Sequence, residues 1–245
     1  MFAETLPDRP AAKAPGRLSK ALIRLLMKRA TVVASERLTD RFRLITLEGA
    51  ALKGVAWAPG DKVQIAMGSA FVARTYTPIE WNAAAGRMCI LGYAHGDGPG
   101  GAWVRTVRPG DECDIFGPRG SLDLRRLSGP LAIFGDETAI GLAYAATRQE
   151  PSRAVTCHFE VGDLESARQV AVELGLQDAA LVERCPDESH VATMVAALPD
   201  LVAAGASFVL VGKAGTVQTL RRALALPASR LLTKAYWASG KAGLD

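Results

Sequence analysis

The stretch Arg74-Thr75-Tyr76-Thr77-Pro78 joins a cation, an aromatic ring and hydroxyl groups on a segment that is typical of one extended strand. Arg74 can pair with a diphosphate through its planar fork of donors, and the Tyr76 ring can lie against a flat heterocycle or a ribose. Thr77 can hydrogen-bond to the edge of that heterocycle. These groups suit the parts of a flavin dinucleotide. The alternative is an ordinary Arg and Tyr pair on a surface strand that ends at a proline.

A glycine-rich turn follows about fifteen residues later, after the apolar run from Met88 to Tyr93. Its sequence is His95-Gly96-Asp97-Gly98-Pro99-Gly100-Gly101-Ala102-Trp103. Glycines let backbone N–H groups approach a phosphate, and a helix that begins at Ala102 would direct its unpaired amides at the same anion. Arg74 and this turn are therefore predicted to hold one diphosphate from two sides, with Tyr93 as a further contact. The alternative is a tight loop in which Trp103 belongs to the core.

Together these segments resemble the siderophore-interacting protein family, which comprises FAD-dependent ferric-siderophore reductases of the ferredoxin-reductase-like superfamily. The resemblance covers most of the chain. The residues that carry it are RTYTP at 74–78, HGDGP at 95–99 with Trp103, PGD at 109–111, GPRGS at 117–121, GDETA at 135–139, and Tyr236-Trp237 followed by Gly240. The chain departs from the family pattern at Gly100-Gly101, at Lys213 and at Val182-Glu183-Arg184.

Length and composition agree with two compact domains. The chain has 245 residues, of which 49% are apolar and 22% charged, and this is enough to bury two cores of ordinary size. No run approaches the length of a membrane span, and the N-terminus lacks the apolar segment of a secretion signal. We therefore expect a monomeric cytoplasmic protein without stable membrane insertion. The four cysteines are widely spaced, which predicts buried thiols rather than a metal site or a redox pair.

Charge is unevenly distributed along the chain. Residues 1–130 contain 19 Lys and Arg against 12 Asp and Glu, whereas residues 131–245 contain 10 against 13. A positive cleft in the first half would attract dinucleotide phosphates and anionic iron chelates. Nucleic acid is not an expected partner, because the basic residues are not interleaved with aromatic stacking platforms.

The first half of the chain predicts a flexible tail, a helix and a barrel. Residues 1–16 are rich in Pro, Ala and charge, and residues 17–29 have the pattern of a basic amphipathic helix that either packs on the barrel or touches a membrane or an acidic donor. Short alternating segments then run to Phe116, with Phe42 and Leu44 on one face of their strand. Two of the predicted strands are each preceded by a Pro-Gly-Asp turn, at residues 59–61 and 109–111. Residues 17–128 are therefore predicted to form an antiparallel barrel, and the resemblance implies a Greek-key FAD-binding barrel.

In residues 129–245 continuous apolar runs alternate with helical segments, which is typical of a parallel α/β domain. The predicted strands are 131–134, 154–159, 180–183, 208–211 and 231–235, with helices that start near residues 137, 164, 190 and 214. The carboxyl ends of these strands should form the edge at which a nucleotide binds. This is the predicted NAD(P)H-binding-like domain.

Four residues near this edge are candidate nucleotide contacts. Asp136, Thr138 and Ala139 follow the first strand, although Asp136 and Thr138 could instead cap the next helix. The resemblance places this stretch near the flavin and nicotinamide, so Thr138 is the best ring donor. Glu160 ends the second strand and is predicted to accept from an adenine-ribose 2′-hydroxyl, which would favour NADH over NADPH.

The resulting hypothesis is electron transfer without a nucleophile, a general base or a metal-ligand set. A bound flavin accepts a hydride and returns its electrons singly, so NAD(P)H, or a ferredoxin-type donor, would reduce a ferric siderophore, with Tyr236 or Trp237 moving aside. Family resemblance supplies this substrate class, and the cations that would receive the anionic chelate are Lys62, Arg119, Lys213 and Lys234. A flavin reductase with another acceptor and a non-catalytic flavin-bound iron-chelate binder or sensor are the alternatives.

Overall fold

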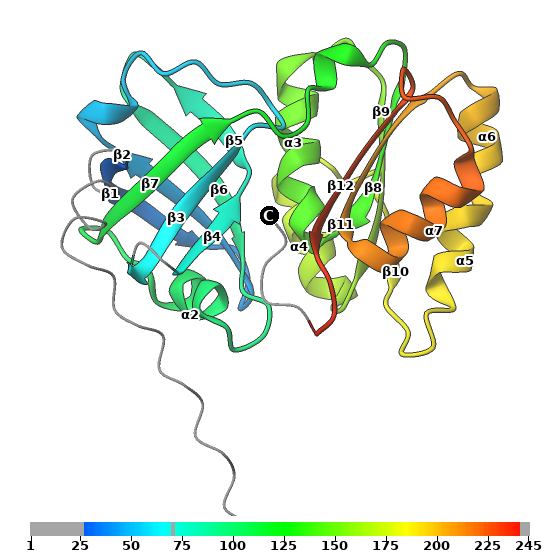
Figure 1. Ribbon diagram of the computed structural model, residues 1–245. Coiled ribbons are helices and arrows are strands. Elements are labelled where there is room, and N and C mark those ends of the chain that lie inside the picture. The colour runs from blue at the N-terminus through cyan, green and yellow to red at the C-terminus, as the bar shows by residue number, and fades with distance from the viewer. Residues whose placement is uncertain (1–26, 70–71, 241–245) are drawn as a thin grey trace, which may run out of the picture.

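The computed structural model describes residues 27–69 and 72–240, which form a curled antiparallel sheet beside a parallel sheet that is flanked by helices (Figure 1). The predicted combination of a β-barrel and an α/β unit is confirmed. Most of the predicted helix at 17–29 lies outside the described residues. Its last two residues correct the prediction, because Lys28 and Arg29 begin the first strand.

The antiparallel sheet contains seven strands in the order β4-β3-β7-β1-β2-β6-β5. Their bounds are β1 (Lys28–Arg37), β2 (Phe42–Glu48), β3 (Lys62–Ser69), β4 (Val72–Tyr76), β5 (Pro78–Asn82), β6 (Arg87–Tyr93) and β7 (Glu112–Arg119). The short helices η1 (Ala50–Leu52) and η2 (Leu124–Arg126) and the helix α2 (Pro99–Thr106) complete this half. The strands β4 and β5 follow each other in the chain and yet stand at opposite edges, so the sheet must curl round on itself.

The interior of the barrel follows the predicted alternation, with one correction. Val63 and Ile65 of β3 and Ile115 of β7 are fully buried in one apolar cluster. In β2, however, Ile45 and Leu47 pack in the barrel core, whereas Phe42 packs against the core of the α/β half. The alternating pattern identified the strand, but it could not show that both faces of β2 meet apolar neighbours.

The two Pro-Gly-Asp turns have the same structure. Asp61 and Asp111 each accept a backbone N–H three residues earlier at 3.0 Å, and their own N–H groups donate to the carbonyls of those residues. The central glycines have φ of +96° and +95°, a region that strongly favours glycine. Each turn leads directly into a strand, β3 or β7.

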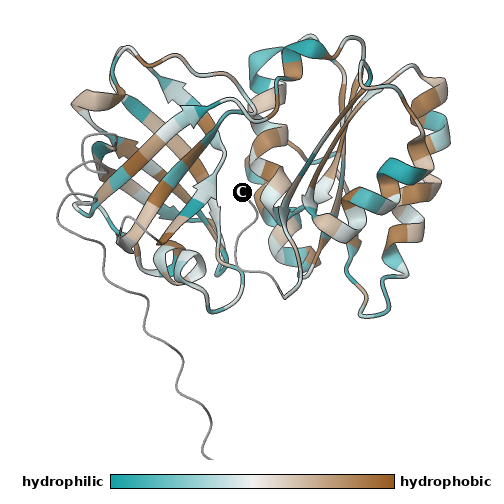
Figure 2. Cartoon of the chain, viewed as in Figure 1, coloured by the Kyte–Doolittle hydropathy of each residue, from teal (hydrophilic) through white to brown (hydrophobic). Residues whose placement is uncertain are grey.

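The second sheet is entirely parallel, in the order β10-β9-β8-β11-β12. Its strands are β8 (Leu131–Asp136), β9 (Val155–Val161), β10 (Ala180–Glu183), β11 (Ser207–Lys213) and β12 (Leu231–Trp237). The helices are η3 (Glu137–Ala139), α3 (Ile140–Gln149), α4 (Leu164–Glu173), α5 (His190–Ala196), α6 (Leu198–Ala203) and α7 (Ala214–Leu224). These strands are largely apolar in Figure 2, as expected for a sheet covered on both faces.

Helix α3 joins the two halves. A Cβ on Gly141 of this helix would lie 2.9 Å from Cγ2 of Ile79 in β5, so the helix lies directly against the barrel wall. On another strand, the Tyr93 hydroxyl donates to Glu137 of η3 at 3.0 Å. We propose the segment around residues 128 and 129, between η2 and β8, as the boundary of the two units. Within the described residues, no helix is both long and apolar enough to cross a membrane.

Candidate flavin and nucleotide site

The strand motif and the glycine turn meet at the start of α2. A Cβ built on Gly100 would lie 3.0 Å from Cγ of Arg74 and 3.5 Å from the Tyr76 hydroxyl. The fold therefore brings together the guanidinium side chain and the helix end that were expected to hold one diphosphate.

The turn before α2 can be built only with small residues at specific places. A Cβ on Gly101 would lie 2.7 Å from the Gly96 carbonyl oxygen and 2.8 Å from that of His95, whereas a Cβ on Gly98 would meet no atom within 4 Å. The backbone is thus packed tightly on its inner side and open on its outer side. An open backbone cradle of this kind fits the diphosphate of FAD.

The helix begins three residues earlier than predicted. Gly98 is the N-cap and Pro99 the first helical residue, so the Ala102 N–H already donates to the Gly98 carbonyl at 3.0 Å. Ala102 therefore cannot offer its amide to an anion. Proline has no N–H, and the amides that this helix leaves without an intrahelical acceptor are those of Gly100 and Gly101.

The aromatic residues of the site form two groups. The rings of Tyr76 and Trp103 have centroids 5.5 Å apart, and both side chains pack partly against the barrel core. Burial raises the pKa of Tyr76, which keeps its phenol neutral. Trp103 is therefore a partly buried residue at the edge of the barrel core, and Tyr76 lies beside Gly100 at the start of α2.

The second aromatic group connects the barrel to the last strand. His95 stacks between Tyr93 and Trp237, with centroids 6.1 Å and 6.2 Å away. The Tyr236 hydroxyl lies close to the Thr77 side chain, and burial raises the pKa of this tyrosine. The end of β12 therefore meets both halves of the predicted flavin site, the strand motif and the glycine turn.

The turn after β8 caps a helix. Asp136 accepts from the Thr138 N–H at 2.9 Å and from the hydroxyl of the same threonine, so the capping interpretation is confirmed. Burial raises the pKa of Asp136 to about 6. The Thr138 hydroxyl proton is thereby engaged and is not offered to a ring, and the apolar Ala139 side chain is fully buried and cannot contact one.

Glu160 requires a correction. This residue ends β9 as expected, but it is 0% exposed, and its carboxylate contacts Nε2 of His190 at 2.6 Å and accepts from the Thr216 hydroxyl at 2.7 Å. Nδ1 of His190 accepts from the Cys185 N–H at 3.0 Å, so Nε2 carries the proton that points at Glu160. Both carboxylate oxygens are used inside the protein, and the structural reason for a preference for NADH does not hold.

Sequence reasoning missed the ion pair that closes this edge of the sheet. Arg184 lies 2.6 Å from Glu137, which is 4% exposed and also accepts from the Gly162 N–H at 2.7 Å and from Tyr93. The signal was present, since each charged residue directly follows a strand of the parallel sheet. Nothing in the sequence showed that these strand ends would pair with each other.

The four candidate substrate cations fall into two pairs. Lys62 and Arg119 are cross-strand partners on β3 and β7, and Arg119 donates to Gln64 at 2.8 Å. Lys213 and Lys234 lie on the neighbouring strands β11 and β12, and Lys213 forms an ion pair with Glu188. The first pair belongs to the barrel and the second to the α/β sheet.

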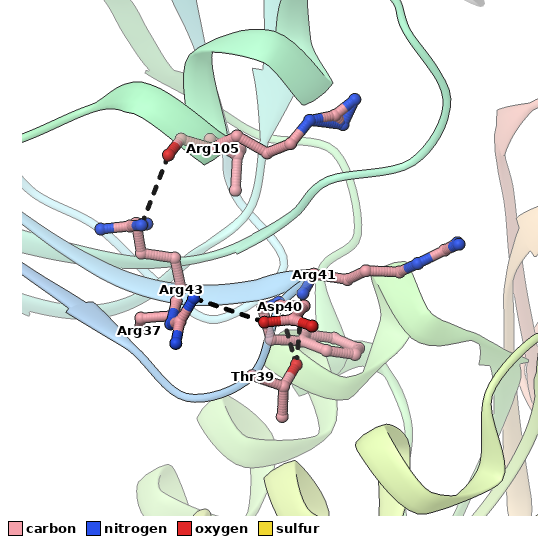
Figure 3. A pocket seen from close by; sticks show the side chains of 8 residues that line it. Arg37, Thr39, Asp40, Arg41, Arg43 and Arg105 are labelled. Atoms are coloured by element: carbon pink, nitrogen blue, oxygen red, sulfur yellow. Dashed lines mark hydrogen bonds and ion pairs between the residues drawn. The ribbon is translucent and has the colours of Figure 1, made fainter.

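A separate pocket of about 260 Å³ opens between the β1–β2 turn and α2 (Figure 3). It is lined by Arg37, Thr39, Asp40, Arg41, Phe42, Arg43, Val104 and Arg105. Its arginines do not converge on one point, because Arg37 pairs with Asp40 at 3.3 Å and Arg43 donates to the Arg105 carbonyl at 3.4 Å. Figure 3 shows the ends of Arg41 and Arg105 turned away from Asp40. Arg74 does not line this pocket. The charges of the pocket arginines are largely paired with other groups of the protein.

Comparisons with known proteins agree with this geometry. The model of the siderophore-interacting FAD-binding domain matches residues 65–122, a range that contains both the strand motif and the glycine turn. No curated protein matches the chain.

Solved structures extend the likeness to the whole fold. The siderophore-interacting protein SipS from Aeromonas hydrophila is 24% identical with a TM-score of 0.72, over 88% of this chain and 93% of that one. A siderophore utilization protein from T. fusca is 23% identical with a TM-score of 0.68, over 89% and 95%. Phthalate dioxygenase reductase is 15% identical with a TM-score of 0.68, over 88% and 70%. The predicted resemblance is confirmed: residues 65–122 match the model of the siderophore-interacting FAD-binding domain, and the chain shares the fold of these solved structures.

Proposed function

We propose that this protein is an FAD-dependent reductase that passes electrons from NAD(P)H to the ferric iron of a siderophore, which releases ferrous iron in the cytoplasm. The observation that carries the proposal is that Gly100, at the start of α2, lies beside the side chains of Arg74 and Tyr76. It joins a fork of cationic donors, the N-terminal end of α2 and an aromatic side chain at one place, as FAD requires.

Each residue of this site has a defined task. Arg74 and the amides of Gly100 and Gly101 would hold the diphosphate, and the half-buried Tyr76 would support the ribityl chain or the ring. Thr77 lies next to Tyr236, so the ring end of the flavin would lie near the end of β12. When bound, FAD supplies the two-electron to one-electron chemistry that ferric iron needs.

The electron donor would approach from the carboxyl edge of the parallel sheet. In open parallel α/β sheets a nucleotide binds outside the carboxyl ends of the strands, and Trp237 at this edge already stacks near His95 of the glycine turn. Because Glu160 is paired inside the fold, NADH and NADPH are both candidate donors. A ferredoxin-type protein is the second donor to test.

The acceptor is proposed to be an anionic ferric chelate. Siderophore-interacting relatives support this class, and cations near the flavin would attract it. Lys213 and Lys234 are the stronger candidates, because they lie on the strand pair that also carries Trp237.

The four cysteines are free thiols, as is usual in a reducing compartment.

The test begins with colour. Purified protein should be yellow, be bleached by NADH or NADPH without oxygen, and regain its colour when a ferric siderophore is added, while a ferrous-specific chelator traps the released iron. Arg74→Ala should weaken FAD binding, whereas Arg87→Ala, an exposed barrel arginine paired with Glu48, should not. A folded protein that takes up no flavin would overturn the proposal. Bleaching without reoxidation by the chelate would favour a flavin reductase with another acceptor, and the absence of bleaching would favour a binder or sensor.

A further inference from the structure

Trp237 is held in a defined position between the two halves of the protein. Its indole N–H donates to Oδ2 of Asp136 at 2.6 Å. The His95 ring stacks near it at an interplanar angle of 25°, and the guanidinium carbon of Arg184 lies 5.9 Å from the centre of the indole. One residue of the last strand thus touches the flavin turn, the turn after β8 and the end of β10.

The Oδ2 atom of Asp136 accepts a hydrogen bond from the Trp237 indole. The carboxylate is fully buried, and its other oxygen, Oδ1, is occupied by the N–H and hydroxyl of Thr138. Gly212 leaves the room that the carboxylate needs, because a Cβ there would lie 2.5 Å from Oδ2. Gly212 also has φ of +103°, which favours glycine. The indole therefore receives a preorganised, charged acceptor.

On the proposed function, a nicotinamide would have to arrive at the place that Trp237 occupies. The preceding residue, Tyr236, lies close to Thr77 of the strand motif, and His95 belongs to the glycine turn that leads into α2. A flat ring that enters between the flavin and the parallel sheet would meet the indole first.

We propose that Asp136 is a positioning residue that latches Trp237 across the nicotinamide entrance, so that a pyridine nucleotide binds only when this hydrogen bond opens. The inference rests on the proposed function, since it assumes that NAD(P)H is the donor. A ligand that must displace a closed state binds more weakly by the fraction of molecules that are open. A hydrogen bond to a charged group is strong enough to make that fraction about one in ten or smaller.

The substitution Asp136→Asn tests the latch with little change of shape. The amide oxygen can still accept from the Thr138 N–H, but the NH₂ group then faces the indole N–H, so two donors oppose each other. We expect the Kd of NADH, measured from the rate of anaerobic flavin bleaching, to fall about tenfold or more, while the limiting rate changes little. Trp237→Phe should lower the Kd to a similar extent, and adding Asp136→Asn to it should have no further effect.

Two further measurements separate the latch from a purely structural role. In protein labelled with ¹⁵N-tryptophan, Asp136→Asn should shift the indole signal of Trp237, which Trp237→Phe identifies, and speed its hydrogen exchange. Asp163→Asn is the matched control, because Asp163 caps α4 by accepting from the Ser166 N–H at 3.0 Å and has no indole partner in the described chain. That control should leave both the signal and the Kd unchanged.

The outcomes are distinct. A Trp237 signal that Asp136→Asn does not move overturns the latch, whatever the flavin does. A moved signal with an unchanged Kd for NADH also overturns it, although the proposed function then stands, because wild-type flavin is still bleached. Failure of both NADH and NADPH to bleach the wild-type flavin overturns the proposed donor and the latch together.

Discussion

Gly101→Ala should weaken FAD binding by deforming the turn before α2. The added methyl carbon would lie 2.7 Å and 2.8 Å from the carbonyl oxygens of Gly96 and His95. Both obstacles are backbone atoms, so the methyl group cannot be relieved by a change of rotamer. Overpacking of this kind costs about 1–3 kcal/mol, and each 1.4 kcal/mol corresponds to about tenfold in affinity. If FAD needs the undeformed turn, its Kd should rise by about 5- to 150-fold.

The assay is a titration of the apoprotein with FAD, followed by quenching of flavin fluorescence, together with thermal unfolding of both forms. Gly120→Ala is the matched control, because a Cβ there has one neighbour within 4 Å, at 3.9 Å, and both the Kd and the Tm should stay at the wild-type values. If Gly101→Ala binds FAD within twofold of wild type, the turn does not hold the diphosphate.

Three other changes test separate parts of the structure. Burial raises the pKa of Asp136 to about 6, so the ionised carboxylate and its hydrogen bond to Trp237 prevail above that pH. The indole NMR signal of Trp237 should therefore titrate with a midpoint near pH 6, and a midpoint near pH 4 would contradict this. Gly141→Ala places a methyl group 2.9 Å from a side chain of β5 and should cost about 1–3 kcal/mol in unfolding free energy; an unchanged denaturation midpoint would exclude the close contact of α3 with the barrel. Replacing Lys213 and Lys234 with alanine should raise the KM for an anionic ferric chelate but leave FAD binding intact, and equal KM values in steady-state assays would remove them from the acceptor site.

Local sequence was sufficient for features that depend on a few neighbouring residues. The two Pro-Gly-Asp turns need a positive φ at their centres and an aspartate that accepts from the backbone, and both requirements are visible in three letters. The buried strands of the parallel sheet were found because apolar runs of that length have few other uses. The glycine turn was recognisable because four glycines fall within residues 95–103, although the helix starts at Pro99 and not at Ala102.

The role of each polar residue at the site depended on contacts from distant parts of the chain. Glu160 follows a strand just as a ribose ligand would, yet it is buried by His190 and Thr216, which lie 30 and 56 residues away in the sequence. Asp136 has its indole partner 101 residues away. No local pattern distinguishes a carboxylate that faces a ligand from one that is paired inside the fold.

The amino-acid sequence by itself was sufficient to predict the strand pattern, the turns and the residues suited to a flavin diphosphate. It was also sufficient to identify the family that the chain resembles. Only the tertiary structure decided which of these groups lie together and which face of β2 packs against the α/β half. It also decided which carboxylates form hydrogen bonds or ion pairs inside the fold. The physical reason is that backbone preferences act over a few residues, whereas burial and ion pairing are set by whichever elements fold against each other.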